Sequence, residues 1–275
     1  MTATLAQLVA ETRQRVGRPK STSQLADLGR SAAHHLPRGF RDALRRMSET
    51  GPAVIAELKK ASPSRGVIRG SFHSSVLAVD LAEAGAAALS VITEEEHFQG
   101  SLGNLSEASA AVDLPCLRKD FFVNEYQVLE ARAYSADAIL LIVAALSDSE
   151  LRSLREAAQR YTLDVLCEVH DAGELKRALD IGFDTIGVNN RDLRTFEVKL
   201  ETAETLAPMI PSGVVKVAES GIRDGSDIRR LRDAGYDAFL IGESLMKAER
   251  PGEVLKELLA GAKAPKAIAG LQPGA

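Results

Sequence analysis

One pattern repeats along the chain from residue 53 onwards and limits the folds open to it. A short β-branched run, a few polar residues and an amphipathic helical pattern follow one another, and eight such runs lie roughly 20–30 residues apart. The runs are AVIAEL (53–58), AALSVI (87–92), PCLRKD (115–120), DAILLIV (137–143), LDVLCEV (163–169), DTIGVN (184–189), VVKVAES (214–220) and DAFLIG (237–242). Strict β–α alternation predicts a parallel sheet, and eight units favour an α/β fold closed as a (β/α)8 TIM barrel.

An open doubly wound sheet is the main alternative for such a repeat. That fold usually carries a Gly-rich dinucleotide turn after its first strand, and KKASPSRG (59–66) is not such a turn. Residues 1–48 fall outside the repeat and contain two helical patterns, LAQLVAETRQRV and GFRDALRRM, with a polar connection between them. We therefore expect an N-terminal helical extension (1–48) packed on a catalytic barrel (49–262), followed by a flexible tail (263–275) rich in Ala, Gly and Pro.

Composition excludes several classes of protein. With 45% hydrophobic and 26% charged residues, the 275-residue chain can bury a sizeable core. Neither a membrane-length apolar run nor a secretory signal is visible, so we expect a cytoplasmic protein. A net charge of -4 argues against nucleic-acid binding. Cys116 and Cys167 lie inside apolar runs, which is typical of buried reduced thiols rather than of a disulfide or a metal site.

Charged residues gather where the predicted strands end, which is the catalytic rim of a (β/α)8 barrel. Glu57 and Lys59 are two residues apart and point the same way. The later strand ends carry Lys119 with Asp120, Glu168, Asn189 with Arg191, and Glu219 with Ser220. Each of these alone is commonly a solvated loop residue, and a buried Lys–Glu pair can simply lock a barrel. Together they indicate acid–base chemistry on a charged substrate.

Further features of the rim bear on the substrate. AESGI (218–222) and IGESL (241–245) offer glycines before a helix, where barrels bind phosphate through backbone N–H groups. Phe98 and Phe121 could form a wall for a flat aromatic group, although packing under a loop is an equal alternative. The histidines show no metal-ligand spacing, and we expect His97 to be exposed and the run EEE (94–96) to be a helix or loop face.

Several blocks of sequence resemble one enzyme family. IAELKKASPSRGVI, TEEEHFQGSL, LRKDFFVNEYQV, ADAILLIV, GVNNRDL, VAESGI and FLIGESLM occur in the order found in indole-3-glycerol phosphate synthases, over roughly residues 50–250. The resemblance implies a lyase of tryptophan biosynthesis that converts 1-(2-carboxyphenylamino)-1-deoxyribulose 5-phosphate into indole-3-glycerol phosphate, carbon dioxide and water. It also implies that no cofactor and no metal take part.

The resemblance implies roles for individual residues. Catalytic residues would be Glu57, Lys59, Lys119, Glu168, Asn189 and Ser220. Substrate contacts would come from Ser62, Phe98, Phe121, Leu140, Arg191 and Glu219, and phosphate contacts from Gly221, Gly242 and Glu243. Lys119 is similar to the general acid, Lys59 to the partner of the substrate carboxylate, and Glu57 to the residue that positions Lys59. Glu168 is similar to the general base of the dehydration, and the lysine that donates the second proton stays open.

One departure and two alternatives accompany this interpretation. Position 243 is Glu, where a small Ser would be comfortable beside a phosphate, although its backbone N–H can still donate. Another phosphate-binding barrel, such as a sugar-phosphate isomerase, would need neither two rim lysines nor an aromatic wall. A barrel that has lost catalysis would not be expected to keep Lys59, Lys119 and Glu168. We expect a phosphorylated small molecule as partner, neither nucleic acid nor membrane, and a monomer or weak homodimer.

Overall fold

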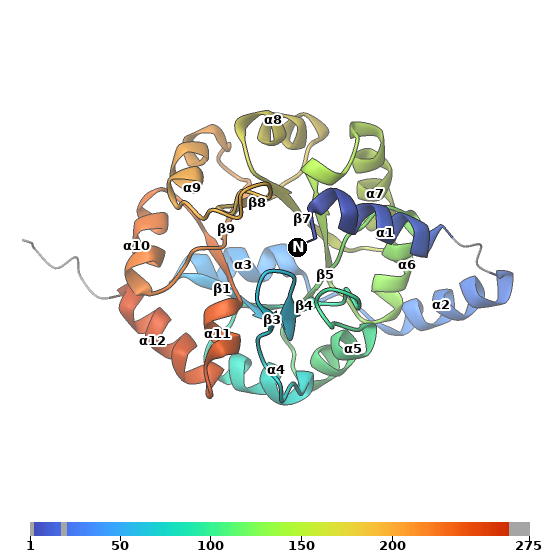
Figure 1. Cartoon of the computed structure of the whole chain (residues 1–275), viewed down its shortest axis with the longest axis horizontal. Helices are drawn as coiled ribbons and strands as arrows, with labels where there is room; N and C mark the ends of the chain where they lie inside the picture. Colours follow the sequence, from blue (N-terminus) through green and yellow to red (C-terminus); the bar gives the residue numbers. More distant parts are fainter. Residues whose placement is uncertain (1–2, 18–20, 264–275) are drawn as a thin grey trace, which may run out of the picture.

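Eight parallel strands close into a barrel, as the repeat predicts (Figure 1). The computed structural model describes residues 3–17 and 21–263. The barrel strands are β1 (Ala53–Leu58), β4 (Ala88–Ile92), β5 (Cys116–Lys119), β6 (Ala138–Ile142), β7 (Asp164–Val169), β8 (Thr185–Asn189), β9 (Val215–Glu219) and β10 (Ala238–Ile241). Each strand pairs with its neighbour in the chain, and β10 returns to β1 through the pairing of Ala53 with Ala238.

Strand register brings the polar strand ends to one rim. Asn189 is paired with Glu219, and Ile142 with Glu168, so neighbouring strands finish level with one another. Parallel strands all finish at the same edge of the sheet, so the groups that follow them converge on the mouth of the barrel. The eight predicted runs each contain one strand, which is shorter than the run by one or two residues except at β1.

Helices surround the strands, and two hydrophobic clusters fill the fold. The helices that follow the strands are α4 (Ser74–Glu83), α5 (Leu102–Ala111), α6 (Glu125–Ala133), α7 (Asp148–Arg160), α8 (Ala172–Ile181), α9 (Glu201–Leu206), α10 (Gly225–Asp233) and α11 (Glu243–Lys247), with 3-10 turns η1 (Val143–Ala145) and η2 (Ala207–Met209). The larger cluster lies between strands and helices and holds Leu81, Leu151 and Phe239. Cys116 and Cys167 are buried there as free thiols, as predicted, and burial raises the pKa of Cys116 to about 12.

The smaller cluster fills the barrel interior and is closed by the N-terminal extension. Phe40 and Leu44 of α3 (Phe40–Ser48) are fully buried against residues at the starts of the strands, such as Ala53 and Val215. Figure 1 shows α3 behind the ring of strands. Fully burying a side chain of this size contributes about 1.5–3 kcal/mol. One end of the barrel is thus sealed, and the site is confined to the other.

Part of the N-terminal prediction is wrong. Between α1 (Leu5–Val16) and α3, residues 17–38 were predicted to be a polar connection, but Thr22–His34 forms helix α2. Ser21 accepts a hydrogen bond from the backbone N–H of Gln24, whose side chain in turn accepts from the backbone N–H of Ser21. This capping box stabilises the start of α2. The helix has no long apolar stripe from which its sequence would be recognised as helical.

A buried carboxylate ties the extension to the barrel. Asp137, at the start of β6, accepts hydrogen bonds from the Arg38 guanidinium at 2.7 Å and from the His35 ring at 3.1 Å. Burial alone would raise the pKa of Asp137, but the hydrogen bonds from His35 and Arg38 hold it below its usual value. The extension therefore packs on the barrel through a charged anchor as well as through apolar contacts.

Helix α12 (Pro251–Lys263) is the last element that the structure describes, and it packs against α4 and α10. The predicted flexible tail, 263–275, lies outside the described residues apart from Lys263. Within 3–17 and 21–263, none of the helices has the length and apolar character needed to cross a membrane.

Candidate active site

The open end of the barrel contains a cavity of about 270 Å³ that holds every residue predicted for the site. All fifteen lie on its wall: Glu57, Lys59, Ser62, Phe98, Lys119, Phe121, Leu140, Glu168, Asn189, Arg191, Glu219, Ser220, Gly221, Gly242 and Glu243. They come from all eight barrel strands or from the loops that follow them. The structure thus brings the predicted residues together, whereas their individual roles stay predictions.

Lys119 stands at the centre of the charged groups. Its Nζ atom lies 2.7 Å from Glu219 Oε2, 3.5 Å from Glu168 Oε2 and 3.9 Å from Glu57 Oε2. The three carboxylates are each at most 5% exposed. Three buried negative charges around one ammonium group form a network in which each proton affects the others.

The pKa values in this cluster move in different directions. Burial alone would lower the pKa of Lys119, but the charges of Glu219, Glu168 and Glu57 raise it above its usual value. Burial and the neighbouring Glu168 raise the pKa of Glu219 to about 7, although Lys119 opposes this. Burial would also raise the pKa of Glu168, but Lys119, with a smaller contribution from His170, lowers it below its usual value. Near neutral pH the cluster therefore holds an ammonium, an ionised Glu168 and a Glu219 that exchanges its proton.

Glu57 and Lys59 do point the same way, as their spacing predicts. Lys59 Nζ donates to Glu57 Oε1 at 2.5 Å, and Lys59 follows directly after the end of β1. The next residues form a hairpin of β2 (Ala61–Ser62) and β3 (Gly66–Val67), and Ser62 lies on the cavity wall. Burial would raise the pKa of Glu57, but Lys59 and Lys119 lower it. An ionised Glu57 thus holds Lys59 in place at the mouth.

Two glycines make room for carboxylates of the buried cluster. A Cβ atom at Gly242 would overlap the side chain of Glu57, and a Cβ at Gly187 would overlap Glu219 Oε1. Gly242 was predicted for phosphate binding, whereas Gly187 was not singled out, because its role depends on a side chain from the neighbouring strand. At both positions glycine is required by the close approach of a carboxylate.

Glu168 is held by groups on two strands and on the following loop. Asn189 Nδ2 donates to its Oε1 at 3.2 Å, and the ring atom Nε2 of His170 lies 3.3 Å from the same oxygen. Nδ1 of His170 donates to Glu174 at 3.0 Å. Sequence reasoning missed His170, and the only signal for it was its position two residues beyond a predicted catalytic carboxylate.

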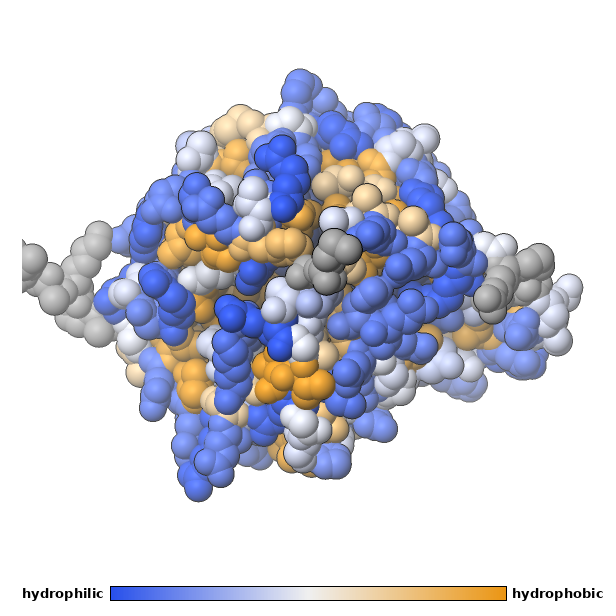
Figure 2. All heavy atoms as spheres, viewed as in Figure 1, coloured by the Kyte–Doolittle hydropathy of each residue, from blue (hydrophilic) through white to orange (hydrophobic). Residues whose placement is uncertain are grey.

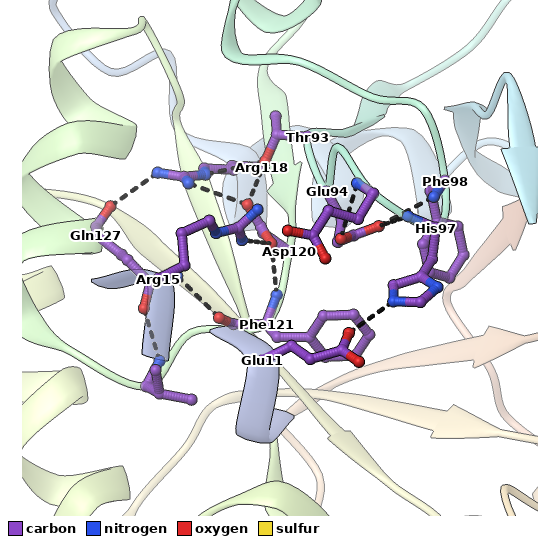
Figure 3. Close-up of polar contacts among 12 residues, drawn as sticks. Glu11, Arg15, Thr93, Glu94, His97, Phe98, Arg118, Asp120, Phe121 and Gln127 are labelled. Atoms are coloured by element: carbon purple, nitrogen blue, oxygen red, sulfur yellow. Dashed lines mark hydrogen bonds and ion pairs between the residues drawn. The ribbon is translucent and has the colours of Figure 1, made fainter. Parts of the chain in front are cut away.

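Two phenylalanines form one wall of the cavity, and buried carboxylates fix the loops that carry them (Figure 3). The rings of Phe98 and Phe121 are 6.4 Å apart between centroids. The Phe98 backbone N–H donates to Glu94, and the Phe121 N–H donates to Asp120. Asp120 is further bonded to Thr93 and Arg118. The prediction that EEE (94–96) is a helix or loop face is wrong for its first residue, because Glu94 is buried and accepts three backbone N–H bonds of its own loop.

Helix α1 lies at the edge of the mouth and adds apolar side chains to it. Leu5 and Leu8 line the cavity. In Figure 2 hydrophobic side chains occur near the middle of this face, and polar ones dominate its periphery. Glu11 of α1 contacts the His97 ring at 2.6 Å (Figure 3). His97 is half-buried by this contact, so the prediction that it is exposed is wrong.

The loops after β9 and β10 form the polar corner predicted for phosphate. Ser220 and Gly221 both have left-handed backbone conformations, with φ of 64° and 84°. Glu243 begins α11 and contacts three cations, namely Lys247 at 2.5 Å, Arg65 at 3.3 Å and Arg191 at 3.9 Å. Ser244 lines the cavity, and its buried Oγ has no hydrogen-bond partner among the described residues. The sequence did not single out Ser244, because a serine in a helical turn carries no signal of its own.

One group of side chains among the described residues has the spacing of metal ligands. Glu11, Glu96 and His97 place one ligand atom each within 4.8 Å of one another. They come from α1 and from the loop after β4, so spacing along the sequence could not reveal them. Both carboxylates are exposed, and such groups are common on protein surfaces without a metal ion.

Comparisons with known proteins agree with this architecture. A model of the indole-3-glycerol phosphate synthase family matches residues 5–258. The indole-3-glycerol phosphate synthase of Koribacter versatilis is 58% identical over 259 residues, which cover 94% of this chain and 100% of the relative. That of Acidithiobacillus ferrooxidans is 50% identical over 260 residues, with coverage of 94% and 99%.

Solved structures with low sequence identity show the fold alone. Thiamine phosphate pyrophosphorylase from Pyrococcus furiosus aligns with a TM-score of 0.59 at 17% identity, and it covers 78% of this chain and 96% of its own. A 3-hexulose-6-phosphate synthase aligns with a TM-score of 0.58 at 15% identity, covering 76% and 99%. The family match over nearly the whole chain and the identity of the two relatives are decisive: the chain belongs to the indole-3-glycerol phosphate synthase family.

Proposed function

We propose that this protein closes the indole ring of 1-(2-carboxyphenylamino)-1-deoxyribulose 5-phosphate and releases indole-3-glycerol phosphate, carbon dioxide and water. The observation that carries the proposal is the buried ammonium of Lys119 among three carboxylates, in the same cavity as the two phenylalanines. A flexible substrate with a carboxylate, an aromatic ring and a phosphate needs each of these surfaces at once.

The cavity offers a complementary group for each part of the substrate. Lys59 pairs with the carboxylate of the aromatic ring, and the ring itself packs beside Phe98, Phe121 and Leu140. The phosphate is held at the opposite corner by Arg191 and by backbone N–H groups of Gly221, Gly242 and Glu243, with the Ser244 hydroxyl as a further donor. Holding both ends of the substrate brings the aromatic carbon next to the carbonyl carbon and removes much of the entropic cost of cyclisation.

Ring closure then needs a proton at the carbonyl oxygen. Lys119 donates this proton while the aromatic carbon that bears the carboxylate forms the new carbon–carbon bond, so the carbonyl oxygen becomes a hydroxyl group. Loss of carbon dioxide from that carbon returns the electron pair and restores the aromatic ring. The raised pKa of Lys119 keeps the proton in place at neutral pH, at some cost in proton-donor strength.

Dehydration completes the product. The hydroxyl group leaves as water after it accepts a proton from one of the two lysines, and Glu168 removes a proton from the ring system to form the indole double bond. The lowered pKa of Glu168 keeps this base ionised in the free enzyme. Asn189 fixes its orientation through the 3.2 Å hydrogen bond.

Charge balance links substrate binding to Glu219. In the cluster, the carboxylates of Glu57, Glu168 and Glu219 face the ammonium groups of Lys59 and Lys119, so three acidic side chains share two lysines. A substrate with a carboxylate and a phosphate adds further negative charge. We infer that Glu219, with a pKa of about 7, takes up a proton when the substrate binds.

Product analysis tests the proposed function. The chain contains no tryptophan, so the fluorescence of an indole product stands out against the protein. The enzyme should form a fluorescent product and carbon dioxide in equal amounts from the carboxyphenylamino substrate, without added metal or cofactor. Consumption of substrate without carbon dioxide would favour an isomerase instead. Cytoplasmic location and a monomeric or weakly dimeric state stay predictions.

A further inference from the structure

His170 lies directly behind the cavity and contacts the proposed base without lining the site. It follows β7 in the loop before α8, and its side chain is only 12% exposed. Nε2 lies 3.3 Å from Glu168 Oε1, and Nδ1 lies 3.0 Å from Glu174 Oε2 in the first turn of α8. Glu174 Oε2 also accepts the backbone N–H of His170 at 2.9 Å. One carboxylate thus fixes both the ring and the backbone of this residue.

The protonation of His170 follows from its partners. An ionised carboxylate can only accept hydrogen bonds, so the ring nitrogen Nδ1, which is hydrogen-bonded to Glu174, must carry a hydrogen. Nε2 lies 3.3 Å from Glu168 Oε1, close enough for an ion pair but outside hydrogen-bond geometry. Two carboxylate charges beside one buried ring favour the imidazolium over the neutral ring. Burial alone would lower the pKa of His170, but Glu168 and Glu174 raise it to about 10, which agrees with the geometry.

We propose that His170 is a positioning residue for Glu168: its imidazolium, anchored by Glu174, keeps the Glu168 carboxylate ionised and oriented for proton removal. The inference rests on the proposed function, in which Glu168 is the base of the dehydration. A carboxylate 4% exposed has little water to stabilise its charge, so fixed protein donors must replace it.

The other charged groups around this pair leave a distinct task to His170. Lys119 on β5 faces Oε2 of Glu168, whereas His170 and Asn189 face Oε1. Glu219 on β9 and Glu57 on β1 share Lys119 with Glu168 and bring no positive charge. Arg177 of α8 is engaged by Asp148 and by the carbonyl oxygens of Val143 and Leu146. His170 is thus the cation that remains beside Glu168 when Lys119 has given its proton to the substrate.

The test uses two variants and a matched control on the same helix. His170→Gln removes the charge, whereas Glu174→Gln keeps an acceptor for Nδ1–H and removes the charge that holds the imidazolium. Asp180→Asn, which breaks an exposed pair with Lys176 on α8, is the control. The readouts are kcat, KM and the dependence of kcat on pH.

We expect His170→Gln to lower kcat roughly 10- to 100-fold, as loss of a supporting partner typically does, with KM within about 2-fold of wild type. Because the imidazolium lowers the pKa of Glu168, its removal should also shift the acid limb of kcat upward by about one pH unit. Glu174→Gln should shift that limb in the same direction by less, and Asp180→Asn should leave both unchanged. A lower kcat with an unmoved acid limb in both variants would reduce His170 to a packing role and overturn the proposal.

A second measurement does not depend on turnover. The ¹⁵N spectrum of histidine-labelled wild type, assigned by the signal missing from His170→Gln, should show an imidazolium at pH 8, and Glu174→Gln should lower its pKa. A neutral ring at pH 8 would overturn the proposal. A wild type that forms no indole product while His170 remains an imidazolium would refute the proposed function and still support the pairing of His170 with both carboxylates.

Discussion

Replacing Lys119 by methionine keeps most of the aliphatic stem and removes an ammonium that faces three buried carboxylates. Its Nζ atom lies 2.7 Å from Glu219, 3.5 Å from Glu168 and 3.9 Å from Glu57. Removing one partner of a buried ion pair costs about 3–5 kcal/mol, because the other charge stays buried without compensation. Three carboxylates share this ammonium, so we expect Lys119→Met to lower the free energy of unfolding by about 4–5 kcal/mol at pH 8.

The loss should depend on pH. In the wild type, burial raises the pKa of Glu219 from 4.5 to about 7, so its contribution to stability is full below pH 4.5 and disappears as the pH rises through about 7. Without Lys119, we expect the folded cluster to bind one further proton at low pH. A proton bound at pH 5.5 and released by pH 8 changes stability by up to about 3 kcal/mol, so the variant should lose only about 1–2 kcal/mol at pH 5.5.

Urea unfolding followed by circular dichroism at pH 5.5 and pH 8 measures this difference. Lys176→Met serves as control, because Lys176 pairs with Asp180 on the exposed face of α8 and should change stability by no more than about 0.5 kcal/mol at either pH. A Lys119→Met protein as stable as the wild type at pH 8, or one equally destabilised at both pH values, would refute the electrostatic reasoning.

Three further substitutions test other parts of the account. In the wild type, kcat/KM should fall above about pH 7, because Glu219 ionises there and repels the anionic substrate. Glu219→Gln should remove this fall in the pH profile. A fall that is unchanged in the variant would show that another group titrates there. Glu243→Ser should lower KM and the inhibition constant of inorganic phosphate about 5-fold, which equals about 1 kcal/mol. The reason is that Glu243 no longer competes with the phosphate for Arg65 and Arg191. A raised inhibition constant would contradict this. Asp137→Asn should lower the free energy of unfolding by about 3–5 kcal/mol at pH 7. The loss should be smaller below pH 4, where the wild-type carboxylate becomes protonated. Equal urea midpoints of wild type and variant at pH 7 would contradict the anchoring role.

The barrel and most of its site could be predicted because they depend on local pattern. Each strand is a mainly apolar run, and β1, β5, β7 and β9 carry a charged residue at or near their ends. Parallel strands then place those residues at one rim. This is why Lys119 at the end of β5 and Glu168 near the end of β7 were found from their positions alone. Helix α2 was missed because Ala32 is its one buried residue, so no apolar stripe marks it, and the capping box of Ser21 and Gln24 was its main sequence signal.

The remaining features depend on contacts between distant segments. His170 becomes a candidate only when its ring is seen between Glu168 and Glu174, since position alone does not show where a side chain turns. Glu94 reads as one of three exposed acids until its loop folds back and donates three N–H groups to it. His97 was predicted to be exposed because its partner Glu11 lies 86 positions away.

The central claim is that this cavity closes an indole ring with Lys119 as the acid, and a fluorescence assay of product formation tests it most directly. The assay compares wild type with Lys119→Ala on the carboxyphenylamino-deoxyribulose phosphate, without added metal or cofactor. We predict indole fluorescence from the wild type and a rate lower by about 10²–10⁴-fold from the variant, the usual loss of a general acid. Near-normal turnover by a folded Lys119→Ala protein, or no product from the wild type, would contradict the account.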